Sequence, residues 1–257
     1  MTVRLGEVIS YLDTTLEIDR FRDYGPNGLQ VEGSPEVDKV VTAVSATAEV
    51  FEQAIEREAD LIVVHHGLIW GGGLGRVTGT TANRLRLLLS RSVSLAAYHL
   101  PLDAHSRLGN GVGLADAIGL QGTRQGFGDV RGHNLGLLGT WSTPLPRADA
   151  IARIAAGVGR DSLPFVFPYG PENVKTVGLC TGAASDLLED AAGVGCDLYL
   201  TGELSERSAA LAKELQITLV AAGHYSTEVF GVQRLVDELR MKFAGLQVEY
   251  IDVPTPV

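Results

Sequence analysis

The stretch Asp60-Leu-Ile-Val-Val-His-His66 is an almost unbroken apolar run that ends in two histidines. Runs of this kind are typical of a strand covered on both faces, as in the parallel sheets of α/β proteins. A second stretch, Asp197-Leu-Tyr-Leu-Thr-Gly-Glu203, opens in the same way. Each is preceded by a strand-like and a helical segment, and each is followed by a helical segment and another apolar strand. This alternation predicts an α/β fold.

The two halves of the chain are similar enough to indicate an internal duplication. Lys39 precedes Asp60 by 21 residues, and Lys175 precedes Asp197 by 22. Chance similarity is the alternative, because many α/β units share this order of elements. A duplication predicts two similar α/β lobes with a metal site between them. The last strand of each half ends near a histidine that is followed four residues later by a carboxylate: His99 with Asp103, and His224 with Glu228.

Three segments are expected along the chain. They are an N-terminal α/β lobe over residues 1–125, a connecting region over 126–172 and a C-terminal α/β lobe over 173–257. The connecting region is richer in Gly, Pro and aromatic residues, and its short strand-like pieces include Leu135–Thr140 and Phe165–Pro168. These pieces are expected either to link the lobes or to pack as extra strands.

The composition excludes several classes of protein. Hydrophobic residues make up 45% of the 257 residues, so a sizeable core is expected. The net charge of −10 disfavours a nucleic-acid partner, because acidic surfaces repel phosphate backbones. No run approaches the roughly 20 apolar residues of a membrane helix, and the start lacks the apolar region of a signal peptide. Cys180 and Cys196 form no C-x-x-C pattern, as expected for reduced thiols in a cytoplasmic protein.

Histidines lie where three predicted strands end, at His65-His66, at His99 and at His224. Ligands of open α/β sheets bind outside the carboxyl ends of the strands. For His65-His66, the alternative is a pair of polar residues at a strand exit. Because adjacent strand residues point to opposite faces, the pair suits two ions about 3.5–4 Å apart better than one ion.

Asp103 and His99 have more than one interpretation. Asp103 lies just past a strand end, which favours metal ligation, but aspartate in a Pro-containing loop commonly forms a local turn. His99 is either a ligand itself or a residue that orients a carboxylate ligand. We favour the orienting role, in which His99 is also a candidate proton shuttle.

His224 and Glu228 are expected to meet at the start of a helix. Ser226 and Thr227 are predicted helix N-caps, which would place His224 before the cap and Glu228 in the first turn. Compensation of the helix dipole is the alternative role for Glu228. As a ligand, Glu228 can bridge two cations with its two oxygens.

The candidate ligands combine three imidazoles and two carboxylates with no thiolate. Such a set accepts Zn, Mn, Fe, Co or Ni, and it leaves positions open for water or substrate, which is typical of reactive sites. We therefore expect two divalent metal ions per subunit. The proposed ligands are His65, His66, Asp103, His224 and Glu228.

Five motifs occur in order along nearly the whole chain: Tyr24-Gly-Pro-Asn-Gly-Leu-Gln-Val31, Asp60-Leu-Ile-Val-Val-His-His-Gly-Leu-Ile-Trp70, Tyr98-His-Leu-Pro-Leu-Asp103, Asp197–Glu203 and Ala222-Gly-His-Tyr-Ser-Thr-Glu228. Their combination resembles the GTP cyclohydrolase 1 type 2 homologue family, also called the Nif-three-like proteins. The resemblance implies a two-lobed α/β fold, a dinuclear metal site with the same five ligands, and a toroidal homohexamer.

The chain departs from the family pattern at two places. Gly67 stands where the family often has Pro, which is a harmless change of loop chemistry. Tyr24-Gly-Pro26 stands where Trp-Asp often precedes the Asn, which bears on any substrate contact made by that segment.

Two functions follow from the resemblance and the donor set. One is a metal-dependent hydrolase of a nucleotide or related heterocycle, because GTP cyclohydrolase activity is attributed to some members. The alternative is a non-catalytic metal-binding or regulatory assembly protein, favoured by the lack of Arg or Lys beside the histidines. A ring around DNA is a third interpretation, which the net charge of −10 disfavours.

Overall fold

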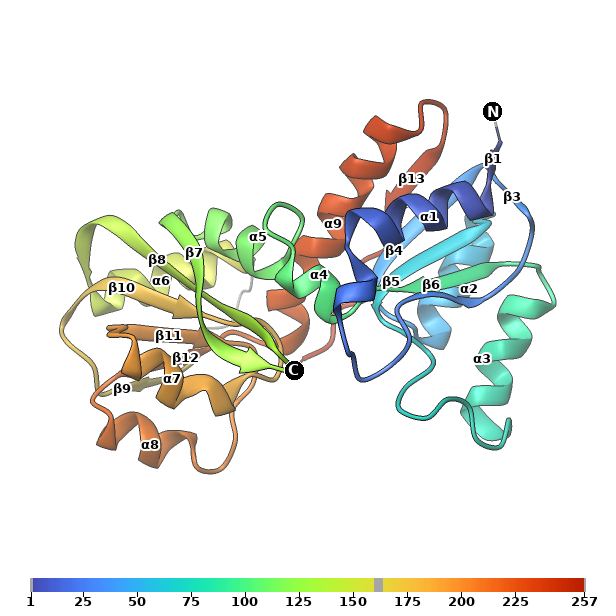
Figure 1. Cartoon of the computed structure of the whole chain (residues 1–257). Coiled ribbons are helices and arrows are strands. Elements are labelled where there is room, and N and C mark those ends of the chain that lie inside the picture. Colours follow the sequence, from blue (N-terminus) through green and yellow to red (C-terminus); the bar gives the residue numbers. More distant parts are fainter. Residues whose placement is uncertain (1, 160–163, 257) are drawn as a thin grey trace. The chain divides into compact units, whose positions relative to one another are not determined.

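The computed structural model describes residues 2–159 and 164–256. The chain divides into two compact units. The first comprises Met1–Leu102 and Gly231–Val253, and the second comprises Asp103–Phe230 and Pro254–Val257. Each unit contains a mixed sheet with helices packed on it (Figure 1). The predicted α/β class is therefore confirmed.

Among the described residues, the first unit builds a sheet of five strands in the order β13-β4-β5-β6-β2. The first four are parallel, and β2 is antiparallel at the edge. Residues 61–65 of β5 are buried, as predicted for a strand covered on both faces. The strands are β2 (Gly28–Val31), β4 (Lys39–Ser45), β5 (Leu61–His66), β6 (Ser94–Ala97) and β13 (Gln247–Tyr250), and β1 (Val3–Arg4) pairs separately with β3 (Glu36–Val37).

The helices of the first unit bury apolar side chains. Ile62 and Val64 of β5 share a core with Phe51 and Leu88 from two helices. The helix that carries Phe51 begins after Thr47, whose side chain accepts a hydrogen bond from a backbone N–H of the first turn. The helices are α1 (Leu5–Thr15), α2 (Ala48–Glu56), α3 (Gly79–Leu89) and a 3₁₀ turn at Ile18–Arg20; α4 (Leu100–Ala104) and α9 (His224–Lys242) each have residues in both units.

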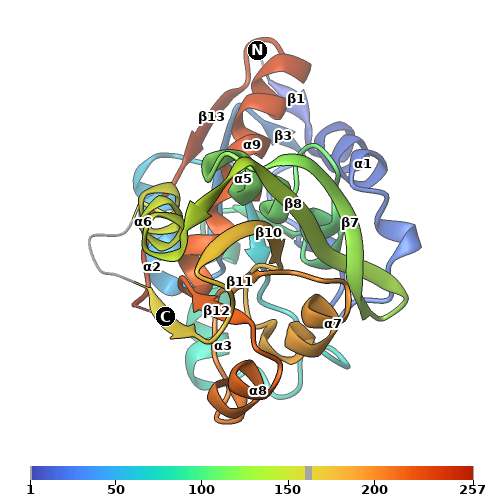
Figure 2. The same ribbon diagram turned by 90° about the vertical axis from the view of Figure 1, so that its left-hand side faces the viewer.

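In the second unit, the residues placed by the structure form a six-stranded sheet in the order β7-β8-β10-β11-β12-β9. The three strands β10, β11 and β12 are parallel, and the others are antiparallel to their neighbours. Figure 2 shows α6 and α7 on opposite sides of this sheet. The elements are α5 (Asn110–Ala117), β7 (Gln121–Val130), β8 (His133–Pro146), α6 (Arg147–Gly157), β9 (Phe165–Pro168), β10 (Asn173–Leu179), a 3₁₀ turn (Ser185–Leu187), α7 (Leu188–Gly193), β11 (Leu198–Thr201), α8 (Ser208–Glu214) and β12 (Thr218–Ala221).

The expected segments 1–125, 126–172 and 173–257 differ from this division. Most of the region 126–172 does not form a separate connection, because β8 and β9 add to the sheet of the second unit. The segment Gly231–Val253 belongs to the first unit, because β13 pairs with β4. A strand pairs with the strand that lies beside it in the folded protein, and the order of strands along the chain does not predict which strand that is.

Four strands of each sheet share one topology. In each, three parallel strands run in chain order, and an antiparallel edge strand that precedes them in sequence pairs with the last. The side chain of Asp60 accepts hydrogen bonds from the backbone N–H groups of residues 38 and 39, and Asp197 does the same for residues 175 and 176. These matches support the predicted duplication.

Strand register corrects one detail of the predicted correspondence. Leu61 pairs with Ser94 in the first unit, and Leu198 pairs with Thr218 in the second. Counting forward from Ser94 and Thr218 matches His99 with Gly223, one residue before His224. The two His–carboxylate pairs that the sequence comparison matched, His99 with Asp103 and His224 with Glu228, are therefore not at equivalent positions of the two units.

Replacing Asp60 or Asp197 by Ala is expected to destabilise the protein by about 2–3 kcal/mol each, because two backbone N–H groups lose a charged acceptor. Both bonds at each site reach the single oxygen Oδ2, so Asn can keep them and should cost less. Urea unfolding would measure the difference. An Ala variant as stable as the parent would show that water replaces the carboxylate at no cost.

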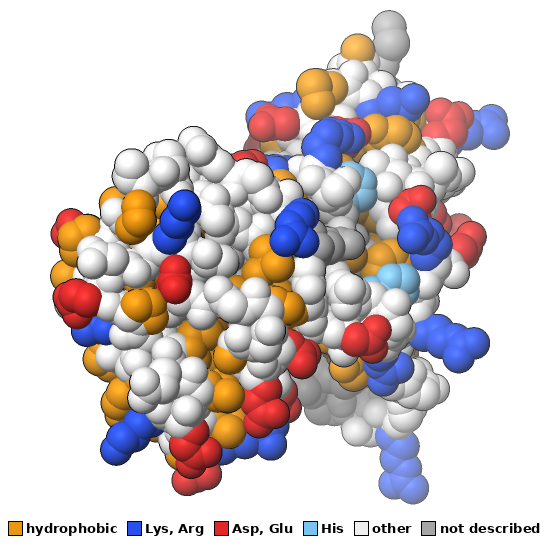
Figure 3. All heavy atoms as spheres, turned by 60° about the vertical axis from the view of Figure 1, so that its left-hand side comes forward, with side chains coloured by type: hydrophobic (Ala, Val, Ile, Leu, Met, Phe, Trp, Pro, Cys, Tyr) orange, Lys and Arg blue, Asp and Glu red, His pale blue; other side chains and the backbone are white. Residues whose placement is uncertain are grey.

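The surface carries charges of both signs. Figure 3 shows Lys and Arg side chains scattered among acidic and uncharged ones on the face it presents. The described residues of this face therefore form no continuous basic strip of the kind that binds a phosphate backbone. None of the helices in the described part of the chain has the length and apolar character to cross a bilayer.

Candidate metal centre

Three histidines of the first unit gather at the carboxyl ends of β5 and β6. The rings of His65 and His66 have centroids 4.5 Å apart, and His99 lies 5.1 Å from the first and 5.6 Å from the second. One ring nitrogen from each lies within 4.8 Å of the others. The structure thus brings His99 into the same cluster as the predicted pair.

Hydrogen bonds fix the orientation of the two histidines on β5. His65 is fully buried, and its Nδ1 lies 3.0 Å from the carbonyl oxygen of Tyr98. A carbonyl only accepts, so Nδ1 is the donor and the neutral ring carries its lone pair on Nε2. His66 contacts the hydroxyl of Ser45 through Nδ1 at 3.1 Å. Both rings are therefore held through Nδ1, which suits metal ligation through Nε2.

Asp23 holds His99. Its side chain is 1% exposed and lies 2.7 Å from Nδ1 of His99. The same carboxylate accepts hydrogen bonds from the backbone N–H groups of Tyr24 and Leu100 and from the side chain of Asn27. Burial alone would raise the pKa of Asp23, but the hydrogen bonds and charge of His99, with those of the other donors, lower it. Asp23 therefore stays ionised, and in the neutral form of His99 it holds the proton on Nδ1 and leaves the lone pair on Nε2.

Replacing Asp23 by Asn is expected to destabilise the metal-free protein by about 2–4 kcal/mol, because whichever end of the amide carries the NH₂ leaves two donors without an acceptor. If that end faces His99, the ring must move its proton from Nδ1 to Nε2. Urea unfolding measures the first effect, and ¹⁵N NMR of the imidazole measures the second. The exposed Asp19→Asn change is the matched control. Unchanged stability together with an unchanged tautomer would contradict the assigned role.

His224 and Glu228 meet in the second unit because they lie one helical turn apart at the start of α9. Nε2 of His224 is 3.0 Å from Oε2 of Glu228. The predicted caps were wrong: α9 begins at His224, so Ser226 and Thr227 lie inside the helix. Gly223 has φ +98°, a conformation that glycine adopts without strain where the chain passes from β12 into the helix. The two side chains therefore share a helix face by i, i+4 spacing.

Glu203 is a functional candidate that the sequence reasoning missed. Its Oε1 lies 2.5 Å from Nδ1 of His224, on the ring side opposite Glu228. Burial lowers the pKa of His224, but the hydrogen bonds and charges of Glu228 and Glu203 outweigh it and raise that pKa to about 9. The pair thus creates a negative field that favours a cation. A signal existed, because Glu203 occupies the place in its motif that His66 occupies in the other.

Asp103 lies in the short helix α4 and not in the loop expected for it. Its Oδ1 accepts hydrogen bonds from Asn110 at 2.9 Å and from Thr181 at 3.3 Å. One of its oxygens lies within 4.8 Å of an oxygen of Glu228. The second unit therefore brings together Asp103, His224 and Glu228.

Gly182 shapes the space around Glu228. Its φ is +68°, and a Cβ there would lie 2.2 Å from Oε1 of Glu228 and 3.2 Å from Nε2 of His224. Glu228 itself is 3% exposed. A glycine is thus required both by the backbone and by the closeness of the Glu228 and His224 side chains.

The donors present fit a metal ion. The described His and Glu groups offer imidazole nitrogens and carboxylate oxygens that could bind a metal, which is the chemistry that Zn, Mn, Fe, Co and Ni accept. Asp23 is a second residue that sequence reasoning missed. Its only signal was its place directly before the Tyr24 motif.

Comparisons with known proteins agree over the full chain. Residues 3–256 match the family described as Duf34/NIF3 (NGG1p interacting factor 3). A protein of Archaeoglobus fulgidus named "GTP cyclohydrolase 1 type 2 homolog" is 41% identical over 98% of this chain and 99% of its own length. A protein of the same name from Pseudomonas aeruginosa is 39% identical over 100% of both chains. The solved structure titled "protein ybgI, unknown function" is similar with a TM-score of 0.90 and 35% identity, covering 99% of this chain and all of the other.

Proposed function

Because the chain belongs to the Duf34/NIF3 family, we propose that it is a metal-dependent hydrolase that acts on a nucleotide or related heterocycle. In this proposal two divalent ions are held by the five ligands predicted from the sequence. The protein acts in the cytoplasm as a homo-oligomer, expected to be a homohexamer. Its relatives' name, GTP cyclohydrolase 1 type 2 homolog, makes GTP the first substrate to test. The proposed ligands are His65, His66, Asp103, His224 and Glu228.

One observation carries the proposal: each unit gathers nitrogen or oxygen donors at the carboxyl ends of its parallel strands. His65, His66 and His99 converge in the first unit, and the His224–Glu228 pair does so in the second. These donors are held by hydrogen bonds that leave ligand atoms facing a common point within each unit. Such preorganisation is typical of metal sites, where hydrogen bonds orient the ligand side chains.

The chemistry that a bound pair of divalent ions supplies is a water ionised near neutral pH and a polarised acceptor atom. The chain's own residues contribute orientation and proton transfer. Asp23 keeps the proton of His99 on Nδ1, so Nε2 can accept a proton from a reacting group and later return it. Glu203 orients His224 through Nδ1.

The alternative is a non-catalytic metal-binding or regulatory assembly protein. A hollow beside His65 and His99 has no Lys, Arg, Asp or Glu among its described lining residues, so it offers no Lys or Arg side chain to bind a phosphate. This alternative predicts tight metal uptake with no turnover.

Metal analysis of untagged protein, followed by turnover assays, separates the two. The hydrolase proposal expects two ions per chain and GTP turnover with added Mn or Zn that is lost in His65→Ala. Full metal occupancy with no turnover of GTP, dinucleotides or phosphoesters would favour the alternative. Light scattering tests the hexamer.

A further inference from the structure

Two partly exposed aromatic side chains flank His99. Tyr24 is 46% exposed, and its ring centroid lies 6.0 Å from that of His99. Trp70 is 39% exposed and lies 5.1 Å from His99 with an interplanar angle of 84°. Exposed apolar side chains that gather in one place commonly mark a binding site, whereas single ones are ordinary. Here the exposure coincides with the histidine cluster of the first unit.

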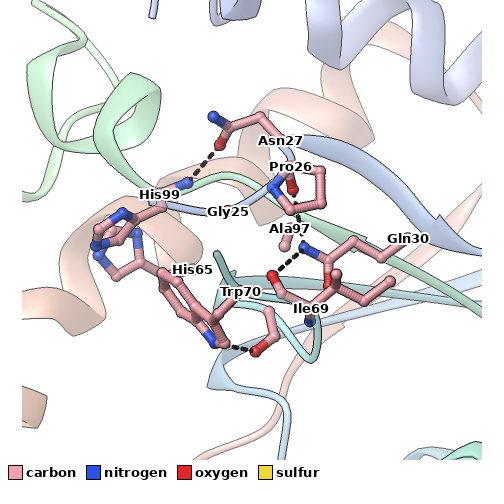
Figure 4. A pocket seen from close by; sticks show the side chains of 10 residues that line it. Gly25, Pro26, Asn27, Gln30, His65, Ile69, Trp70, Ala97 and His99 are labelled. Atoms are coloured by element: carbon pink, nitrogen blue, oxygen red, sulfur yellow. Dashed lines mark hydrogen bonds between the residues drawn. The ribbon is translucent and has the colours of Figure 1, made fainter. Parts of the chain in front are cut away.

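The indole of Trp70 is held in place. Its Nε1 donates a hydrogen bond to the carbonyl of Gly67 at 2.8 Å. The side-chain oxygen of Gln30 accepts from the backbone N–H groups of Leu68 and Ile69, at 2.8 and 3.0 Å. Figure 4 shows Trp70 beside His65 and His99, with Gln30 on the far side of the loop. These hydrogen bonds hold the indole and the backbone of its loop in one orientation.

The segment that carries Tyr24 is tied to the same loop. The backbone N–H of Gly71 donates to the carbonyl of Tyr24 at 2.6 Å, and the side chain of Gln30 donates to the carbonyl of Pro26 at 2.8 Å. The two chain segments thus form one wall, with Tyr24 and Trp70 on it. A preorganised wall loses little entropy when a ligand binds.

The chemistry of the wall indicates what it binds. Its hollow is small, with a volume of about 170 Å³ even when the open mouth is included. A ring would therefore lie across the rim. The lining is uncharged apart from its histidines, so it suits a planar, uncharged ring better than a phosphate. The described lining residues are Gly25, Pro26, Asn27, Gln30, His65, Gly67, Ile69, Trp70, Ala97 and His99.

We propose that Trp70, assisted by Tyr24, stacks against the heterocyclic base of a nucleotide substrate and thereby decides which substrates reach the histidine cluster. This inference rests on the proposed function and narrows its substrate class to molecules that present an uncharged planar ring. Stacking tolerates different bases, because every base has a π-face. Trp70 therefore selects for the presence of a ring more than for its identity.

Calorimetric titration of the metal-loaded protein with guanosine 5′-monophosphate and with ribose 5-phosphate tests the inference, because the second probe has a hydroxyl group in place of the base. The parent is expected to bind the first at least about tenfold more tightly. In Trp70→Ala this ratio should fall below about threefold, with the metal content unchanged, whereas Trp70→Phe should keep most of it. Phe165→Ala, at an exposed aromatic on the edge strand of the second unit, is the matched control and should match the parent.

Equal affinities of the parent for both probes would overturn the inference, as would a ratio that survives in Trp70→Ala. If the Trp70→Ala variant folds poorly, the affinity ratio is measured in Trp70→Phe, which keeps an aromatic ring. Metal content separates the two proposals. A parent that binds two ions but shows no ring preference defeats only the stacking role, whereas a parent that binds no metal defeats the proposed function.

Discussion

Glu228→Gln is expected to reduce bound metal from two ions per chain to nearly none. In the proposed site, this carboxylate would help to hold both ions, and an uncharged amide cannot supply two anionic oxygens. Because Gln has the same shape, the fold should survive the change. His66→Ala, by contrast, removes one imidazole and should mainly weaken the binding of one of the two ions. Metal analysis after dialysis against a weak chelator measures both.

Glu189→Gln is the control for the loss of one negative charge. This residue is exposed on α7, and its substitution should leave metal content unchanged. Two ions retained in Glu228→Gln would remove Glu228 from the ligand set. A loss of metal in the control would show instead that the overall negative charge of the protein, and not ligation by Glu228, controls metal binding.

Gly182→Ala is expected to destabilise the second unit strongly. The backbone at φ +68° costs a non-glycine residue about 1–2 kcal/mol. The new Cβ would also lie 2.2 Å from Oε1 of Glu228, so either the carboxylate or the loop must move. We expect a total loss of about 3 kcal/mol or more in the free energy of unfolding. Metal affinity should fall at the same time.

Gly193→Ala is the matched control, because nothing lies within 4 Å of a Cβ at the end of α7. Ala favours a helix over Gly by about 1 kcal/mol, so this variant should be as stable as the parent or more so. Urea unfolding and metal analysis of both variants test the prediction. A Gly182→Ala protein that unfolds like the parent and keeps its metal would show that Glu228 has room to rotate away.

Relatives of this chain carry a name that refers to GTP, but the chemistry of the site gives a more specific test than the name does. The donor atoms favour a divalent cation, and the wall beside them favours a ring. If both hold, metal content and ring preference will respond to different substitutions. Ligand variants should then change the first, and Trp70 variants should change the second.

The sequence alone determined the α/β class and the strands that carry the candidate ligands. Apolar runs such as 61–64 indicate a strand that is buried on both faces. A histidine at the end of such a run must lie at the carboxyl end of the strand, where ligands of α/β sheets bind. The repeated Asp-Leu openings likewise predicted the shared topology, because an aspartate at that place holds the start of the neighbouring strand.

Tertiary structure alone decided which residues support those ligands and where the units divide. Asp23 is 76 residues from His99, and Glu203 is 21 residues from His224, yet each touches its histidine. Such contacts depend on the spatial neighbours of each strand, as does the return of β13 to the first unit. Local sequence patterns record which face of an element is buried, but they do not record its partner, because hydrogen-bonding strands pair by position in space and not by order along the chain.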